Sequence, residues 1–132
     1  MPKQVITPGD VHPPIGGGYS HAIKAGNTVY LAGQVGLDRQ GSLVGKGDIE
    51  AQADQVYQNV VAVLKAAGLS FKDVVKVTTY LTRSEDIPKV RAVRARYFPT
   101  SEPPASTLVV VSGLANPDFL IEVEAIAVAG QA

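Results

Sequence analysis

The chain has no cysteine, no excess of charge of either sign and no long apolar run. Without cysteine it has no disulfide, no thiolate nucleophile and no cysteine-bound metal, and its composition fits a reducing compartment. Its 12 basic and 12 acidic residues balance, and no run of like charge is longer than "RAVRAR" at 91–96. This pattern predicts neither a nucleic-acid partner nor a membrane partner, so we expect a small molecule or another protein.

The absence of long apolar runs bears on targeting as well. The start "MPKQVITPGD" lacks the apolar core of a signal peptide, and no segment approaches the ~20 apolar residues of a membrane span. We therefore expect a cytoplasmic protein. A length of 132 residues suits a single domain, residues 1–132.

The predicted order of elements is strand, strand, helix, strand, helix, strand, strand. Residues 8–18 are rich in proline and glycine and predict a loop, and Gly26 with Asn27 predicts the turn of a hairpin. Asp48 is expected to cap the first helix, and Ser84 or Asp86 the second. Periodicity then predicts a strand over 28–36, a helix from Asp48 to Gly68, a strand over 73–82, a helix over 86–97, and strands over 106–112 and 119–128.

Two helices of this length cover only one face of a sheet of five or six strands. The segments "TLVVV" and "TVYLAGQV" are nevertheless apolar on both sides, which is typical of strands buried on both faces. We therefore predict that the second face packs against copies of the same chain in a closed oligomer.

The segment "FLIEVEAIAV" at 119–128 places two carboxylates in one of the most apolar strands. Alternate side chains of a strand share a face, so Glu122 and Glu124 point to the same side. Burial of an unpaired carboxylate is unfavourable, so each needs a partner, water or a function. Two interpretations stay open: an ion pair across an interface, or a functional carboxylate in a partly apolar cleft.

The two histidines give little support to nucleophilic or metal chemistry. Ser20 and His21 are neighbours in an extended segment and point to opposite faces, so a hydrogen-bonded His21 is favoured over a catalytic dyad. His12 lies in the proline loop, and without cysteines or a tight acidic cluster we expect no metal. The glycines before Tyr19 fit either a ligand approach or a simple turn.

Several segments together are similar to one known family. They are "GGYSHAI", "VYLAGQVGLD", "QADQVYQNVVAVLKAAG", "VVKVTTYL", "PAS" and "IEVEAIAV". In order and spacing they resemble the YjgF/RidA family of reactive-intermediate (enamine and imine) deaminases, over about residues 13–128. The resemblance implies an α+β fold of the chorismate-mutase-like type, with a mixed β-sheet and two helices on one face. It also implies a homotrimer with a central β-barrel core and a cleft at each subunit boundary.

The resemblance also implies a reaction and its residues. In active members the cleft hydrolyses an imine, the tautomer of an enamine, to a carbonyl product and ammonia without a cofactor. The family's glutamate falls on Glu122, which would hold or activate the attacking water. The tyrosine that closes the pocket falls on Tyr19, and the glycine whose carbonyl faces the substrate nitrogen falls on Gly33.

The segment "PPASTLV" at 103–109 departs from the family pattern. Where this chain has Ser106, deaminating members have an arginine that grips the substrate carboxylate in a bidentate fork. Thr107 and Leu108 follow, and only the backbone amide of Leu108 would contribute. Loss of such a charged pair removes about 2–4 kcal/mol of binding, so a simple 2-imino acid is not the expected substrate. Arg91, on the helix that borders the cleft, either supplies the cation or is an ordinary solvated helix residue.

Two classes of function stay open. In the first, Glu122 handles water in the hydrolytic deamination of an enamine or imine, and Tyr19, Ser106, Thr107 and Arg91 shape the substrate. In the second, the same trimer binds a small metabolite or a partner without turnover. Relatives have also been linked to ribonuclease, translation-inhibiting and chaperone roles, but the neutral charge gives RNA binding no support.

Overall fold

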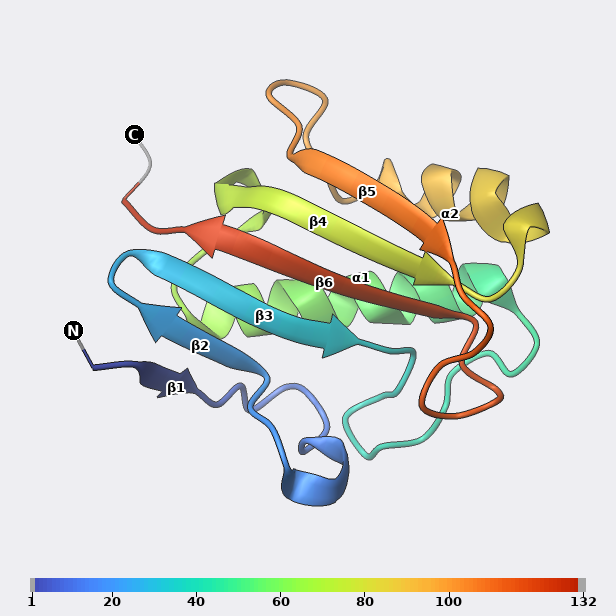
Figure 1. Ribbon diagram of the computed structural model, residues 1–132, viewed down its shortest axis with the longest axis horizontal. Coiled ribbons are helices and arrows are strands. Elements are labelled where there is room, and N and C mark those ends of the chain that lie inside the picture. The colour runs from blue at the N-terminus through green and yellow to red at the C-terminus, as the bar shows by residue number, and fades with distance from the viewer. Residues whose placement is uncertain (1, 131–132) are drawn as a thin grey trace.

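The computed structural model describes residues 2–130 as one mixed sheet with two helices (Figure 1). The strands are β1 (Gln4–Ile6), β2 (Ala22–Ala25), β3 (Thr28–Gln34), β4 (Val74–Leu81), β5 (Ala105–Val110) and β6 (Ile121–Val128). The helices are α1 (Ile49–Ala66) and α2 (Ile87–Arg94), with 3-10 turns η1 (Ile15–Gly17), η2 (Phe71–Asp73) and η3 (Ser84–Asp86). Neither helix combines the length and the apolar composition needed to cross a membrane.

The sheet order is β1-β2-β3-β6-β4-β5. Neighbouring strands are antiparallel except β4 and β5, which are parallel and are connected through α2. The predicted α+β class with a mixed sheet is confirmed. The sequence prediction missed β1, because three residues are too few to show an alternating pattern.

Helix α1 begins and ends as its sequence predicts. The Asp48 carboxylate accepts a hydrogen bond from the Ala51 amide at 3.2 Å and so caps the first turn. Gly68, with φ of +76°, lets the chain leave the helix in the left-handed region. Helix α2 differs in part from the prediction, because Asp86 occupies its N-cap position but the Asp86 side chain makes no capping hydrogen bond. Instead, the Asp86 carboxylate accepts two hydrogen bonds from the Arg83 guanidinium.

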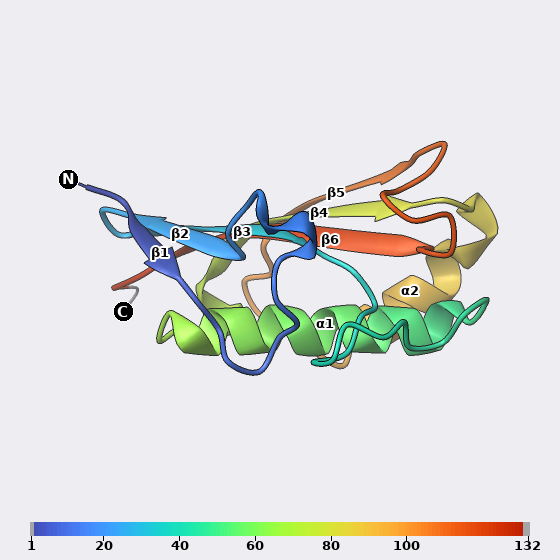
Figure 2. The same ribbon diagram turned by 90° about the horizontal axis from the view of Figure 1, so that it is seen from below.

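Both helices lie on one face of the sheet, as predicted (Figure 2). Strand β6 lies between β3 and β4, and its residues alternate between buried and half-buried. The buried set faces the helices and consists of Ile121, Val123, Ala125 and Ala127. Glu122 and Glu124 therefore point to the opposite, uncovered face.

A single row of paired residues crosses the whole uncovered face. The register connects, in order, Val5, Ile23, Tyr30, Ile126, Lys76 and Ala105. The first four are apolar, and Val5 and Tyr30 are 52% and 50% exposed. Edge strand β5 is also largely exposed on both sides, although its apolar sequence predicted burial on both faces. A single chain thus leaves uncovered the surfaces that we expected a partner to bury.

Candidate functional site

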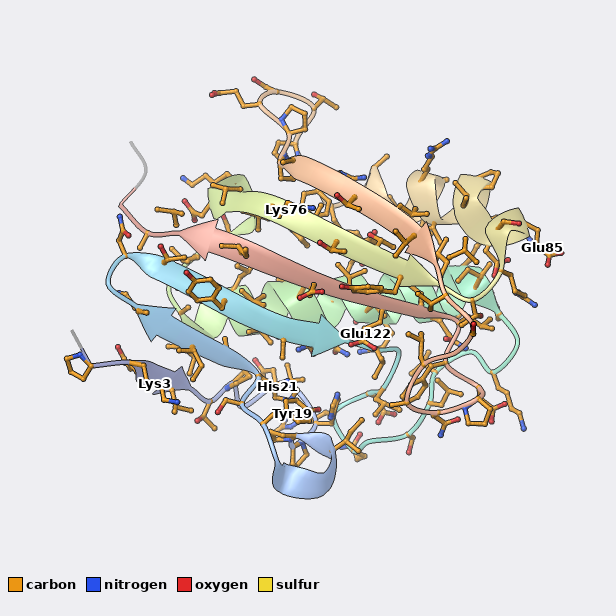
Figure 3. All side chains as sticks on the ribbon, viewed as in Figure 1. Lys3, Tyr19, His21, Lys76, Glu85 and Glu122 are labelled. Carbon is orange, nitrogen blue, oxygen red and sulfur yellow. The ribbon has the colours of Figure 1, made fainter. Side chains whose placement is uncertain are left out.

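Glu122 lies where β3 loses its register with β6. The pairing of the two strands shifts between Leu31 and Gln34. A Cβ atom at Gly33, inside this irregular step, would stand 1.9 Å from Glu122 Oε2 and 2.8 Å from its Cγ. The carboxylate therefore lies directly against the Gly33 backbone, and only glycine leaves it this space. Figure 3 shows Glu122 at this end of β3.

A shallow, open hollow of about 320 Å³ adjoins this contact. It is lined by Gly33, Tyr80, Val111, Gly113, Leu114, Glu122 and Glu124. Its walls thus come from β3, β4, β6 and the loop that follows β5. Its volume lies at the lower end of the range for small-molecule pockets. Two of the predicted site residues, Gly33 and Glu122, meet in this hollow.

The two carboxylates in the hollow have different surroundings. Burial raises the pKa of Glu122, and the negative charge of Glu124 raises it further. The Glu124 carboxylate accepts a hydrogen bond from the Tyr80 hydroxyl, and this bond raises the pKa of Tyr80. Glu124 is therefore held by its neighbour, whereas Glu122 is the carboxylate whose proton affinity the site has increased. A carboxyl with a raised pKa suits proton transfer.

Tyr19 and His21 lie between the loop that contains η1 and the start of β2 (Figure 3). The Tyr19 hydroxyl accepts a hydrogen bond from the Ile15 amide at 3.0 Å, and its ring meets the His21 ring edge-on at 5.9 Å. His21 is buried and hydrogen-bonded, as favoured from the sequence, and its partners are the His12 carbonyl and the Gln34 side chain. Tyr19 itself does not line the hollow in the single chain.

In the segment 103–109, which differs from the family pattern, successive side chains point to opposite faces of the sheet. In the parallel pairing of β5 with β4, Ser106 and Leu108 oppose Val77 and Thr79, which are buried under the helices. Ser106 and Leu108 therefore face the helix side of the sheet. Thr107 faces the uncovered side, where its Oγ1 accepts a hydrogen bond from Lys76 Nζ at 2.8 Å. Within one chain, Ser106 and Leu108 thus lie across the sheet from Glu122.

The sequence prediction missed the arginine that contacts Ser106. Arg94 Nη1 donates a hydrogen bond to Ser106 Oγ at 3.0 Å, and the Arg94 guanidinium carbon lies 5.1 Å from the centre of the Phe98 ring. The predicted candidate, Arg91, is exposed one turn earlier on the same helix. A spacing of three residues puts both arginines on one side of α2, so the sequence alone did not distinguish them.

No cluster of three or more His, Cys, Asp or Glu side chains suited to a metal ion occurs within residues 2–130. The groups in the hollow are instead one carboxylate with a raised pKa, a glycine backbone and the Tyr80 phenol, which is bound to Glu124. Such a set can move a proton to or from a small molecule or a water.

The fold and the site define a small α+β protein whose uncovered sheet face carries a carboxylate held against a glycine. The family model described as endoribonuclease L-PSP matches residues 11–129. The chain belongs to this family, and the resemblance to YjgF/RidA proteins is confirmed. Enamine deamination is an activity for which a member of the family is named.

Two relatives and two solved structures illustrate the similarity. RutC family protein PH0854 of Pyrococcus horikoshii is 48% identical over 125 residues, which cover 95% of this chain and 97% of that protein. The 3-aminoacrylate deaminase RutC of Acinetobacter baylyi is 40% identical over 127 residues, covering 96% and 98%. A Yersinia pestis protein of unknown function from the conserved Rid family has a TM-score of 0.91 at 36% identity, covering 97% and 100%. Escherichia coli TdcF with bound serine has a TM-score of 0.87 at 29% identity, covering 96% and 99%.

Proposed function

We propose that the protein hydrolyses a reactive enamine or imine to a carbonyl product and ammonia, without a cofactor, and that Glu122 is its catalytic residue. The observation that carries the proposal is the raised pKa of a half-buried carboxylate that lies against Gly33 in a small open hollow. The name of the relative from Acinetobacter baylyi, a 3-aminoacrylate deaminase, supports the same reaction class.

The chemistry needs few groups. An enamine tautomerises to an imine, and once the imine nitrogen is protonated the adjacent carbon is already electrophilic. Glu122 takes a proton from water as the water oxygen bonds to this carbon, giving a carbinolamine. Glu122 then returns this proton to the nitrogen, and the carbon–nitrogen bond breaks as the hydroxyl group gives its proton to Glu122 and becomes the carbonyl, so that ammonia leaves. The Gly33 carbonyl would accept a hydrogen bond from the substrate nitrogen and favour its protonated form.

We propose that the working form is a homotrimer whose sheets form a central β-barrel. The apolar half of the uncovered face, with Tyr30 at 50% exposure, supports burial against other copies of the chain. The opposite orientation of Ser106 and Glu122 supports it too, because a cleft that uses both needs one from each of two subunits. A molar mass in solution three times the chain's 13.8 kDa is expected.

Arg94 is proposed to bind a carboxylate of the substrate in that cleft, with Ser106 and the Leu108 amide beside it and Tyr19 closing the pocket. Ser106 holds one nitrogen of the guanidinium, which leaves further N–H groups for a bidentate contact. Arg94 reaches the site from α2 rather than from β5. We therefore expect an acid that differs in length or placement from a simple 2-imino acid. Arg91 remains the second candidate for this role, and Thr107 lies on the sheet face with Glu122.

The alternative is a trimer that binds a small metabolite without turnover. The specific feature in its favour is Ser106, which the resemblance places at the position of the substrate-binding arginine of deaminating members. The serine bound to the similar TdcF structure shows that a family member binds a small amino acid. By contrast, the word endoribonuclease in the family description finds no support in a chain with zero net charge.

One experiment separates these functions. Ammonia release is measured from 3-aminoacrylate and from imines generated by an amino-acid oxidase, with small and long side chains. We compare wild type, Glu122→Gln and the surface control Glu85→Gln. The proposal expects catalysis by wild type and the control, and a loss of roughly 100-fold or more in Glu122→Gln. If wild type does not exceed the uncatalysed rate with any substrate, the reaction is excluded, and calorimetric titration with serine tests the binding function.

A further inference from the structure

His21 joins two parts of the molecule that flank the Glu122 site. It is 3% exposed, and its Nε2 lies 2.7 Å from the His12 carbonyl oxygen. Its Nδ1 lies 3.1 Å from Nε2 of Gln34, which is 1% exposed. The same Gln34 nitrogen donates to the Ala32 carbonyl at 3.2 Å, and the Ala32 amide donates to the His21 carbonyl at 2.9 Å.

These contacts determine where the hydrogens lie. A backbone carbonyl only accepts, so His21 Nε2 carries a proton and donates it to the His12 oxygen. The Ala32 oxygen also only accepts, so the Gln34 amide must present its nitrogen to it. That nitrogen then donates its other hydrogen to His21 Nδ1, which therefore carries none. His21 is neutral in this arrangement.

The hydrogen bonds to His21 hold the chain on both sides of Gly33. Ala32 and Gln34 are its chain neighbours, and both are bound to His21, one through the backbone and the other through its side chain. Gly33 is the residue against which the Glu122 carboxylate lies. Between Leu31 and Gln34 strand β3 has no regular pairing with β6, so this step is held from the opposite edge of β3, by the contacts to His21.

We propose that His21 is a positioning residue: its neutral ring, through Gln34, holds Gly33 in place under Glu122, and protonation of the ring releases this hold. The proposal rests on the proposed function only for its effect on rate. The coupling between His21 and Gly33 is a property of the fold and is testable without any substrate.

Protonation disrupts the link because it turns an acceptor into a donor. A hydrogen on Nδ1 faces the Gln34 amino group, and two donors cannot share one hydrogen bond. Rotating the Gln34 amide would satisfy the ring, but it would turn the Gln34 oxygen toward the Ala32 oxygen and break that bond. Either response loosens the segment that carries Gly33. A displacement of about 1 Å at a catalytic group reduces rates by roughly 100-fold.

The surroundings of the ring keep it neutral at neutral pH. The titratable groups that meet it are His12, whose ring centre is 5.0 Å away, and Tyr19, at 5.9 Å. Burial lowers the pKa of His21 and the charge of His12 lowers it further, whereas the hydrogen bond to the His12 carbonyl opposes them. The ring therefore gains its second proton, and the hold on Gly33 is lost, on the acid side of the pH range in which histidines usually titrate.

The test follows the backbone amide of Gly33 by NMR between pH 8 and pH 4.5 in wild type and in His21→Gln, whose residue 21 does not titrate. In wild type the imidazole nitrogens of His21 are followed over the same range. The matched control is His12→Gln, which removes the other buried imidazole but keeps the carbonyl that His21 uses. We expect the Nε2–H tautomer at pH 8. The Gly33 amide should shift together with the His21 ring in wild type and the control, and this transition should be absent in His21→Gln.

A kinetic arm connects this coupling to the reaction. Gln34→Ala leaves His21 in place but removes the link, so kcat/KM should fall by about 10–100-fold. The acid transition that follows His21 should disappear from its pH profile, while the one due to Glu122 stays. A Gly33 amide that does not respond when His21 titrates, or the opposite tautomer at pH 8, overturns the positioning role. If no imine is hydrolysed, the proposed function fails, but the NMR result still decides whether His21 positions Gly33.

Discussion

Arg94 on α2 and Ser106 on the edge strand β5 are joined by a hydrogen bond of 3.0 Å between Nη1 and Oγ. The face of the Phe98 ring lies 5.1 Å from the same guanidinium carbon. The short side chain of Ser106 and the long side chain of Arg94 together thus place a guanidinium cation beside residue 106. Phe98 and Ser106 restrict its orientation, so fewer rotamers are lost when an anion binds.

Removal of this cation should weaken binding of a carboxylate substrate. We expect Arg94→Ala to raise KM by roughly 10–100-fold, because a hydrogen bond to a charged group contributes about 1.5–3 kcal/mol. Arg94→Lys should recover only part of the loss, since an ammonium cannot make the bidentate contact. The measurement is steady-state ammonia release with the best substrate of the panel.

Two other arginines test which side chain is used. Arg96→Ala removes an exposed arginine just beyond α2 and should leave KM unchanged. Arg91→Ala should change KM less than Arg94→Ala does. A large effect of Arg91→Ala with none of Arg94→Ala would assign the role to Arg91 instead.

Gly33→Ala tests the contact between Gly33 and the carboxylate of Glu122, the proposed catalytic residue. The new Cβ would stand 1.9 Å from Glu122 Oε2, so the Glu122 side chain has to move. We expect a destabilisation of about 1–3 kcal/mol, typical of overpacking, and a loss of activity larger than that of stability. Denaturant unfolding and ammonia release measure the two effects. Gly113→Ala is the control, because its Cβ meets nothing within 4 Å in the same hollow. Equal effects of the two substitutions would contradict the tight contact.

Tyr30→Lys tests the oligomer. Tyr30 lies near the middle of the apolar row on the uncovered face, so a charge there would be buried in the proposed trimer. Light scattering should show a smaller species for Tyr30→Lys at micromolar concentration. Val61→Lys is the control, since Val61 is 40% exposed on α1, on the helical side. A wild-type chain that is monomeric, or a Tyr30→Lys trimer, would refute the use of this face.

Local patterns predicted the elements well because their causes are local. The Asp48 cap, the apolar stripe of α1 and the alternation of β6 each depend on residues within a few positions. The Asp86 side chain does not cap α2 because Arg83, three residues earlier, engages its carboxylate in an ion pair that the helix pattern does not show. Strand β1 was missed because it is only three residues long and its pairing with β2 is non-local.

The candidate site was less accessible to sequence reasoning. The shared face of Glu122 and Glu124 follows from period two, but the contact of Glu122 with Gly33 depends on where β3 shifts register against β6. The bond from Gln34 to His21 spans 13 residues of chain and two strands. The side of the sheet that Ser106 faces depends on its parallel register with β4, which no local pattern shows.

Glu122→Gln should stabilise the folded protein at neutral pH even as it removes activity. The folded-state pKa of Glu122 is raised above its ordinary value of 4.5, mainly by burial. As pH rises through the interval between these two values, the unfolded chain loses its proton first, so the stability of wild type falls. The neutral amide of Gln carries no such penalty.

The expected signature is a difference that depends on pH. Glu122→Gln should exceed wild type in free energy of unfolding at pH 7.5, and the excess should vanish below pH 4.5, where both side chains are neutral. The contribution of His21, whose lowered pKa reduces stability on acidification below about 6.5, is common to both proteins and cancels. Urea unfolding at one fixed protein concentration measures the difference, with Glu85→Gln as a surface control. A variant that is equally destabilised at both pH values would show that Glu122 serves the fold rather than the site.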